Sequence, residues 1–302
     1  MRENKSVPIW VITDGIIGHL NQLKGLVAAL EQQISVEVHW IEVKSRWQSL
    51  SAVRGSFAQL PKPDWVMGAG SATQLAVVYA ARRAQAKSII LMKPGIPIGL
   101  FDLCVVPRHD RVSPRHNVIE TIGVLNRVIP SDSHDATQGL ILIGGPCENY
   151  IWDRARIVNQ IEQVLTRPGI HWRIATSRRT DEALLNELAS RFARVPLIQP
   201  HEVDGNWLPE QLAKAGEVWA SEDSVSMVFE ALTSGTLVGL LRLDPKAHKR
   251  RCRIVTEMQR LVDDAWVQTI DNSYAKMSNL SFAQLWESRR VADLICRSLL
   301  MQ

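Results

Sequence analysis

Short apolar runs rich in β-branched residues alternate with amphipathic segments along most of the chain. Strands that alternate with helices are typical of parallel sheets covered by helices on both faces. The predicted strands are Pro8–Thr13, Val36–Ile41, Asp64–Gly68, Ser88–Met92, Leu103–Val106, Leu140–Gly144, Trp172–Thr176, Leu197–Gln199, Glu217–Ala220 and Leu237–Leu241. The segments predicted as helices include Leu20–Leu30, Trp152–Leu165, Asp181–Phe192, Val225–Thr233 and Ser281–Leu300.

A polar stretch without periodicity, Ile129–Gly139, separates the two series of strands. The pattern therefore predicts two α/β domains, residues 1–130 and 138–302, with the last helix free to pack back on the first domain. The expected fold is two Rossmann-like parallel-sheet domains that face each other across a cleft. Ligands of open parallel sheets bind beyond the carboxyl ends of the strands, so the loops that follow each strand are the candidate sites.

Composition narrows the class of protein. The 302 residues are 46% hydrophobic and 22% charged, as in soluble globular proteins. No apolar stretch reaches transmembrane length and the first one is too short for a signal peptide, so we expect a cytoplasmic protein. The four cysteines, Cys104, Cys147, Cys252 and Cys296, form no CxxC pair, so neither a zinc site nor a disulfide framework is expected.

The net charge of +4 is partly concentrated in Pro245–Arg253, "PKAHKRRCR". Such a run is either a solvated helix face or a surface that attracts phosphates, as on an anionic membrane or a phosphorylated substrate. No aromatic and basic motif of a known nucleic-acid-binding module accompanies it, so nucleic acid is not an expected partner.

The first strand ends in a loop that carries two titratable side chains, Asp14 and His19, beside Gly15 and Gly18. The spacing is not the GxGxxG of a dinucleotide site, and no acidic residue in the right context follows the second strand. Glycines and a helix start permit close approach of a ligand, and either side chain could act as a general base. Alternatively, Asp14 caps the helix and His19 packs against a neighbour. The motif continues through Asn21 and Gln22.

Two further loops follow strands of the first domain. "GAGSATQ" places Gly70, Ser71 and Thr73 at the entry to a helix, which indicates either a ligand loop or a hydroxyl-capped turn. "VPRHD" places His109 and Asp110 at the same edge of the sheet, as a catalytic pair or an ordinary surface pair.

Two loops of the second domain contain candidate phosphate ligands. "ILIGGP" ends a strand at Gly144 and Gly145, where the backbone can approach a ligand. "IATSRRT" places Ser177, Arg178 and Arg179 between a strand and a helix, and guanidinium groups there suit a phosphate. Exposed arginines that balance nearby acids are the alternative.

The segment Trp219–Leu241 has the most detailed pattern. Ser221 or Asp223 is predicted to cap a helix whose first turn contains Ser224 and Ser226, beside free N–H groups suited to a diphosphate. Glu230 follows four residues after Ser226, on the same helix face, and a buried glutamate needs a partner, such as a ribose diol or a basic side chain.

This helix resembles the nucleotide-sugar motif of GT-B glycosyltransferases, in which a glutamate binds the nucleotide ribose and a glycine follows five residues later, as Glu230 and Gly235 do here. More broadly, six motifs, "TDGIIGHLNQ", "GAGSATQ", "FDLCVVPRHD", "LIGGP", "TSRRT" and "SEDSVSMVFEALTSG", are similar in order to the elongated-mitochondria (mitochondrial fission) family. Two positions depart from these patterns. Leu237 stands where many GT-B proteins have proline, and Lys93 stands where relatives tend to have a more neutral residue.

The resemblance implies a metal-independent, inverting glycosyltransferase that uses a nucleotide sugar as substrate and no cofactor. The acceptor would be an envelope glycan or glycolipid, such as a lipopolysaccharide or lipooligosaccharide core, with peripheral contact at the inner face of the inner membrane. His19 or Asp14 would be the base on the acceptor side, and the second domain would bind the donor. A non-catalytic adaptor that docks a protein partner, as in the plant member that recruits a dynamin-related GTPase, and a nucleotide-sugar 2-epimerase are the alternatives.

Overall fold

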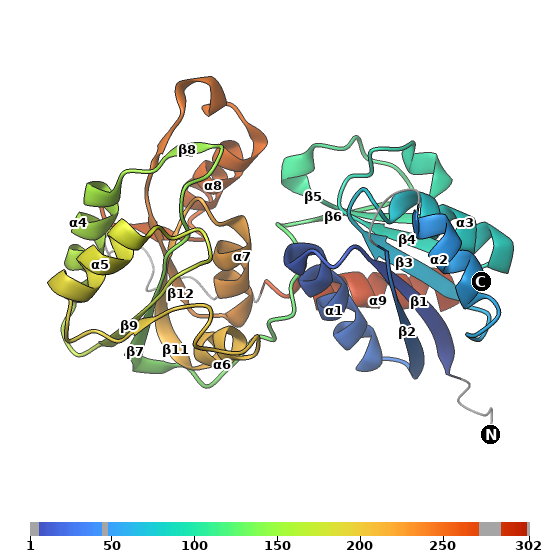
Figure 1. Cartoon of the computed structure of the whole chain (residues 1–302), viewed down its shortest axis with the longest axis horizontal. Helices are drawn as coiled ribbons and strands as arrows, with labels where there is room; N and C mark the ends of the chain where they lie inside the picture. The colour runs from blue at the N-terminus through green and yellow to red at the C-terminus, as the bar shows by residue number, and fades with distance from the viewer. Residues whose placement is uncertain (1–5, 44–47, 272–284, 301–302) are drawn as a thin grey trace. The chain divides into compact units, whose positions relative to one another are not determined.

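The computed structural model describes residues 6–43, 48–271 and 285–300. The chain divides into two compact units, residues 1–127 with 286–302, and residues 128–285. Each unit contains one six-stranded sheet whose paired strands all run parallel (Figure 1). The predicted α/β class with two parallel sheets is thereby confirmed.

The first sheet has the order β2-β1-β3-β4-β5-β6. Its strands are β1 (Val7–Thr13), β2 (Val36–Glu42), β3 (Trp65–Ala69), β4 (Lys87–Leu91), β5 (Leu103–Pro107) and β6 (Val118–Thr121). Its helices are α1 (Ile17–Glu31), α2 (Gln48–Ser56), α3 (Gln74–Ala84) and α9 (Glu287–Leu300), with short 3-10 turns η1 (Ile98–Leu100) and η2 (Arg108–Asp110).

Strand β1 explains why this sheet is covered on both faces. Ile9 and Val11 pack with Leu23 and Leu26 of α1 and with Val291 of α9. The alternate residues, Trp10 and Ile12, pack on the other face in the core that includes α2 and α3. Because successive side chains of a strand point to opposite faces, an uninterrupted apolar strand requires helices on both sides.

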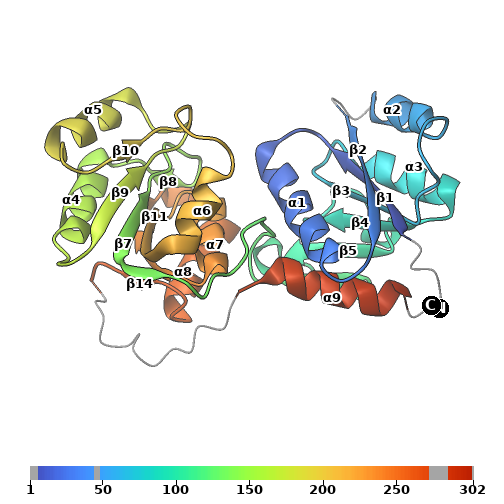
Figure 2. The same ribbon diagram turned by 90° about the horizontal axis from the view of Figure 1, so that it is seen from below.

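Helix α9 belongs to the first unit, where it packs against α1 (Figure 2). This helix begins at Glu287, and residues 281–284 of the predicted helix Ser281–Leu300 lie outside the described residues.

The second sheet has the order β10-β9-β7-β11-β12-β14. Its strands are β7 (Asp135–Leu142), β9 (His171–Ala175), β10 (Leu197–Ile198), β11 (Ala215–Ser221), β12 (Leu237–Leu241) and β14 (Gln268–Thr269); β8 (Tyr150–Ile151) and β13 (Asp244–Pro245) form a separate antiparallel pair. The helices are α4 (Arg154–Leu165), α5 (Glu182–Arg191), α6 (Trp207–Lys214), α7 (Val225–Ser234) and α8 (Arg253–Asp263), with a 3-10 turn η3 (Ala247–Lys249).

Helices cover both faces of the second sheet as well. Ile157 and Ile161 of α4 and Leu184 of α5 pack with Ile141 of β7 and Trp219 of β11. Helices α6 and α7 contact each other, and α6 contacts the strands β7 and β11 (Figure 2). The basic run Pro245–Arg253 is not a helix face, because it spans the end of β13 and η3 and stops where α8 begins.

Candidate functional site

The first sheet reverses its strand order between β1 and β3. From β1 the chain continues to β2 on one side, and β3, β4, β5 and β6 follow on the other. At such a switch point the two loops beyond the carboxyl ends diverge and leave a crevice, which is where open α/β sheets bind ligands. The loops at this point are those after β1 and β3, which carry Asp14, His19 and Gly70.

Asp14 and His19 form a hydrogen-bonded pair in the loop after β1. Nδ1 of His19 lies 2.9 Å from Oδ2 and 3.0 Å from Oδ1 of Asp14. The side chain of Asp14 is 8% exposed and that of His19 is 22% exposed. A carboxylate on Nδ1 holds the proton there and leaves Nε2 as the basic nitrogen. No hydrogen bond from a described residue reaches Nε2 of His19.

Asp14 does not cap α1. Its Oδ1 accepts from the N–H of Ile16 at 3.1 Å, which closes a turn before the helix. The N-cap is Ile16, with no side-chain cap bond, and α1 begins at Ile17, before the predicted start at Leu20. His19 therefore lies in the first turn of the helix, on a rigid element that fixes its distance from Asp14.

Gly70 is the contact between the loops after β1 and β3. It has φ +87°, and a Cβ at this position would lie 2.5 Å from both Oδ2 of Asp14 and Nδ1 of His19. No side chain fits there while the Asp14–His19 pair keeps its geometry. Gly70 is required at this position because the backbone approaches the pair closely.

The other predicted residues of these two loops are less directly involved. Gly18 is exposed, and a Cβ added to it would have no other atom within 4 Å, so glycine is not needed there for close approach. Gln22 is buried and donates to Sδ of Met92, and Asn21 is half-buried. Thr73 is buried and donates to the carbonyls of Ala69 and Gly70 instead of capping α3, whereas Ser71 is exposed.

His109 and Asp110 follow β5, at a distance from this switch point. Strand β5 is separated from β1 by β3 and β4, and each step between strands is about 4.8 Å. Nε2 of His109 lies 4.0 Å from Oδ1 of Asp110, too far for a hydrogen bond. The carbonyl of Asp110 accepts from Nζ of Lys93 at 3.3 Å. The two residues share the sheet edge, but they do not extend the Asp14–His19 pair.

One carboxylate near the first loop, that of Glu42, belongs to no motif in the local sequence. Strand β2 ends at Glu42, one residue beyond the predicted end, and its Oε1 lies 3.5 Å from the Cβ position of Gly15. Gly15 has φ +75°, so the turn after Asp14 brings its backbone towards Glu42. Parallel pairing of Thr13 with Glu42 was the signal that could have located it.

The second sheet reverses its strand order between β7 and β11. The loop after β7 carries Gly144 and Gly145, and the loop after β11, which ends at Ser221, carries residues 222–224. The N–H of Gly144 donates to Oγ of Ser221 at 2.8 Å, and the N–H of Gly145 donates to Oδ2 of Asp223 at 3.1 Å. In this conformation both glycine N–H groups are used within the protein and are not available to a phosphate.

Arg179 and Asp223 form an ion pair at this switch point. The Nη2 to Oδ2 distance is 2.8 Å, and the same guanidinium donates to the carbonyl of Gly145 at 2.9 Å. The side chain of Asp223 is fully buried, whereas that of Arg179 is 41% exposed. Asp223 therefore neutralises Arg179 and does not cap α7, so the expected pair of phosphate-binding arginines is reduced to Arg178.

Ser177 joins the loops after β7 and β9. Its hydroxyl donates to the carbonyl of Gly144 at 2.8 Å, and Thr180, which the sequence did not single out, donates to the same oxygen at 2.6 Å. Both hydroxyls therefore donate to the protein's own backbone. Arg178, between them in sequence, is exposed and lines a cavity of about 400 Å³ with Ser177, Gln199 and His201.

Helix α7 begins beside the Arg179–Asp223 pair. Ser224 is its N-cap and makes no side-chain cap bond, so neither Ser221 nor Asp223 caps it as expected. Ser226 is exposed and Glu230 is 8% exposed, so the two residues differ in environment although they are one turn apart. Gly235, with φ +86°, ends the helix as predicted.

Three observations concern metals, membranes and thiols. Within residues 6–43, 48–271 and 285–300, no group of three His, Cys, Asp or Glu side chains is placed to hold a metal ion. None of the described helices is long and apolar enough to cross a membrane. The four cysteines are free, and burial raises the pKa of the Cys104 thiol to about 12.

Comparison with known proteins places this architecture in a fold group. A UDP-GlcNAc 2-epimerase from Neisseria meningitidis, solved with UDP-GlcNAc, is similar with a TM-score of 0.59 and 13% identity, over 98% of this chain and all (100%) of that chain. MurG from Acinetobacter baumannii is similar with a TM-score of 0.50 and 13% identity, over 96% and 99% of the two chains. The fold is therefore that of GT-B glycosyltransferases and UDP-GlcNAc 2-epimerases.

Sequence comparison identifies the family. An uncharacterised protein of Rickettsia prowazekii is 21% identical over 347 aligned positions, which cover 95% of this chain and 97% of that protein. A family model described as mitochondrial fission ELM1 matches residues 17–299. The chain belongs to the mitochondrial fission ELM1 family.

Proposed function

We propose that this protein is a metal-independent, inverting glycosyltransferase that moves a sugar from a nucleotide sugar to a cell-envelope acceptor, such as a lipopolysaccharide or lipooligosaccharide core. The observation that carries this proposal is the Asp14–His19 pair, whose 2.9 Å hydrogen bond lies at the switch point of the first sheet. An oriented imidazole with an unoccupied Nε2 is suited to deprotonate a hydroxyl near neutral pH.

In the proposed reaction, Nε2 of His19 takes the proton of an acceptor hydroxyl as its oxygen attacks the anomeric carbon of the donor sugar. The bond between that carbon and the diphosphate oxygen breaks, and the nucleoside diphosphate leaves with both electrons of the bond. Asp14 holds the ring in position through Nδ1 and stabilises the imidazolium that forms. This assignment makes His19 the base and Asp14 its positioning residue.

The leaving diphosphate carries negative charge that must be stabilised in the transition state. Arg178 is exposed beside the cavity after β9 and β10, and α7 begins at the same sheet edge without a side-chain cap. A cation and a helix N-terminus would together supply the charge that a metal ion supplies in other transferases. Gln199 and His201 of that cavity offer hydrogen bonds to a nucleobase.

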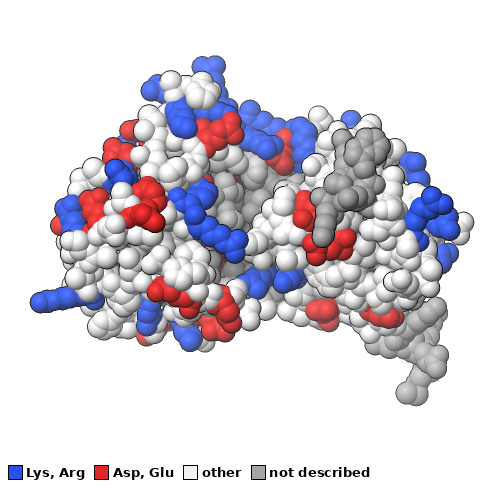
Figure 3. Space-filling model, in the orientation of Figure 1, with Lys and Arg blue, Asp and Glu red and all other residues white. Residues whose placement is uncertain are grey.

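A lipid-linked acceptor agrees with two surface features. Ile16 and Ile17, between Asp14 and His19, are 55% and 50% exposed. In the second unit, Lys and Arg side chains gather over the loop of β13 and η3, which contains Lys246, Lys249, Arg250 and Arg251 (Figure 3). Apolar side chains suit a lipid tail, and a basic loop suits the anionic inner face of the inner membrane.

The direct test is ligand-observed NMR of the full chain with UDP, GDP, CMP and ADP sugars at millimolar concentration. UDP sugars are the first to try, because the epimerase that shares the fold was solved with UDP-GlcNAc. We expect one nucleotide class to bind and to release its sugar to lipooligosaccharide core fragments. Binding by none of the four classes would remove the transferase and leave a protein-docking role.

A nucleotide-sugar 2-epimerase is the second candidate, because two of the similar structures are UDP-GlcNAc 2-epimerases, with TM-scores of 0.59 and 0.57. The two activities separate without any knowledge of the acceptor. An epimerase inverts C2 of the nucleotide sugar in the absence of acceptor, which proton NMR detects directly, whereas a transferase leaves the donor unchanged until an acceptor is added.

A further inference from the structure

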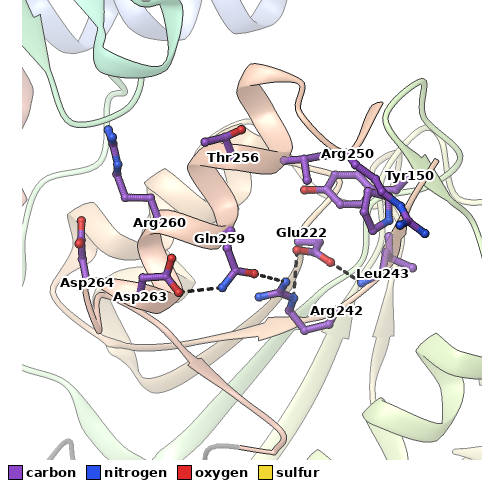
Figure 4. Close-up of a pocket in the computed structure, with 12 residues that line it drawn as sticks. Tyr150, Glu222, Arg242, Leu243, Arg250, Thr256, Gln259, Arg260, Asp263 and Asp264 are labelled. Atoms are coloured by element: carbon purple, nitrogen blue, oxygen red, sulfur yellow. Dashed lines mark hydrogen bonds and ion pairs between the residues drawn. The ribbon is translucent and has the colours of Figure 1, made fainter. Parts of the chain in front are cut away.

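The second unit contains a cavity of about 610 Å³ that the proposed transfer reaction does not use. It lies where β11 and β12 end and has α8 as one wall (Figure 4). Tyr150, Glu222 and Arg242 line its inner part, and Thr256 and Gln259 of α8 face them. Its volume is within the range of about 300–1,000 Å³ that is usual for small-molecule sites.

This cavity is separate from the loops assigned to the donor. Ser221 and Asp223 hydrogen-bond to Gly144 and Gly145 on the β7 side. Glu222, in the turn that follows β11, instead contacts residues that follow β12. One carboxylate oxygen accepts from the N–H of Leu243, and the other forms an ion pair with Nε of Arg242, both just beyond β12.

Two buried polar groups in the cavity, the Tyr150 hydroxyl and the Glu222 carboxyl, indicate that it binds a polar ligand. Tyr150 is 2% exposed, and its hydroxyl has no hydrogen-bond partner among the described residues. A buried hydroxyl without a partner costs about 1–3 kcal/mol, so native proteins rarely retain one without a reason. Burial raises the pKa of Tyr150, so the phenol keeps its proton and remains a hydrogen-bond donor. Figure 4 shows this hydroxyl directed towards the space between Thr256 and Glu222.

The charges of the cavity indicate the class of ligand. Its lining contains the three cationic side chains of Arg242, Arg250 and Arg260 and the three carboxyl groups of Glu222, Asp263 and Asp264. Gln259 accepts from Arg242 at 2.9 Å and donates to Asp263 at 2.8 Å, which links a cation to a carboxylate within the wall. A phosphate site would have excess positive charge, whereas this cavity offers both donors and acceptors.

Hydroxyl groups donate and accept at the same time, so a polyhydroxylated ligand matches this lining. Leu243, Pro245 and Val255 add an apolar side to the cavity, which suits the C–H face of a pyranose ring. We propose that the cavity at the ends of β11 and β12 is a carbohydrate-binding site in which one sugar hydroxyl accepts from Tyr150 and another donates to Glu222. The site would bind an uncharged sugar unit whether or not the protein also binds a nucleotide sugar.

The test measures binding to the full chain by saturation-transfer NMR. The ligands are the monosaccharides N-acetylglucosamine, glucose, galactose and mannose. Tyr150→Phe removes only the hydroxyl, and its fold is checked by thermal melting. We expect at least one monosaccharide to bind to the wild-type chain. Tyr150→Phe should lower the affinity for that monosaccharide about tenfold, because one hydrogen bond is lost. Tyr79→Phe is the control, because Tyr79 lies in the other unit, against the apolar core around α3.

Glu222→Gln provides a second variant that keeps the size of the side chain. This substitution should weaken binding of the same monosaccharide, because the amide replaces one hydrogen-bond acceptor of the carboxylate with a donor. The proposal is overturned if no monosaccharide binds to the wild-type chain, or if binding is unchanged in both variants. It is also overturned if inorganic phosphate competes with the bound sugar and Tyr150→Phe leaves that competition intact, because the cavity would then be an anion site.

Discussion

The carboxylate of Asp14 holds Nδ1 of His19 at 2.9 Å and leaves Nε2 without a hydrogen bond from any described residue. The pair resembles the arrangement in which a buried acid selects the tautomer of a catalytic histidine. The geometry therefore favours one division of the two roles that the sequence left open: Asp14 positions the ring, and His19 takes the proton.

Asp14→Asn is expected to reduce the transfer rate about 10²- to 10⁴-fold and to leave donor affinity unchanged. An asparagine amide donates to Nδ1, which moves the imidazole proton to Nε2 and removes the base. Transfer kinetics and donor titration by NMR measure the two effects separately. Glu37→Gln is the control, since Glu37 forms a carboxylate–histidine contact on β2, at 3.1 Å from Nε2 of His39, away from the candidate site. A wild-type rate in Asp14→Asn would contradict the assignment of roles.

Gly70→Ala tests whether the pair depends on the close approach of the β3 loop. Alanine is strained at φ +87°, and its Cβ would lie 2.5 Å from both Asp14 and His19. We expect a loss of stability of at least about 1 kcal/mol together with a large loss of transfer. Urea unfolding and a transfer assay measure the two quantities.

Gly18→Ala is the control for Gly70→Ala, because Gly18 lies in α1 with open space around its Cβ position. Alanine in a helix should leave stability equal or raise it by about 0.5 kcal/mol. Equal effects of the two substitutions would show that the Asp14–His19 pair does not depend on Gly70.

The fold class could be predicted because the central strands consist of continuous apolar runs that are recognisable from the local sequence. In β1, four consecutive apolar residues, Ile9 to Ile12, are all fully buried, which is typical of a strand covered on both faces. Strands β6 and β14 contain no such apolar run. β6 reads "VIET" and has only one buried residue, Thr121, and β14 consists of the two polar residues Gln268 and Thr269. Only their pairing with β5 and β12 makes them strands.

The candidate site was predictable only in part, for a related reason. Asp14 and His19 are five residues apart and follow a strand, so local sequence is enough to single them out. Their contact with Gly70, and the contact of Arg179 with Asp223, depend on which strands are neighbours in the sheet. Arg179 could not be distinguished from Arg178 by type or spacing, yet one is held in an ion pair and the other lines a cavity.

Arg178 and Arg179 should therefore respond differently to the same substitution. Arg179→Ala leaves the buried carboxylate of Asp223 without its cation and is expected to cost about 1–3 kcal/mol of stability. Arg178→Ala removes an exposed side chain and should change stability by less than about 0.5 kcal/mol. If Arg178 contacts the diphosphate, donor affinity falls about tenfold in Arg178→Ala. Urea unfolding and donor titration distinguish these results.

A double variant separates the ion pair from other effects at Arg179. Asp223→Asn removes the buried charge, so Arg179→Ala combined with Asp223→Asn should cost less than the sum of the two single substitutions. Strictly additive costs would mean that the 2.8 Å contact contributes nothing to stability.

The ionisation of Glu222 should make the free energy of unfolding depend on pH. Burial raises the pKa of this carboxyl from 4.5 to about 7, although Arg242 acts in the opposite direction. Between pH 4.5 and 7 the folded state therefore holds a proton that the unfolded state has released. Stability is highest below pH 4.5 for this group and falls as the pH rises to about 7, by up to about 3 kcal/mol.

Glu222→Gln should remove this decline, because the amide does not titrate. Urea unfolding at a series of pH values between 4.5 and 7 measures the slope for the wild-type chain and the variant. Glu148→Gln is the control, since the hydrogen bond from Lys249 lowers the pKa of the exposed Glu148 and places its titration below this range. An unchanged slope in Glu222→Gln would mean that Glu222 is ionised throughout the range, with Arg242 outweighing burial. In that case the carboxylate would accept hydrogen bonds in the cavity at all these pH values, and its affinity for a sugar hydroxyl would be independent of pH.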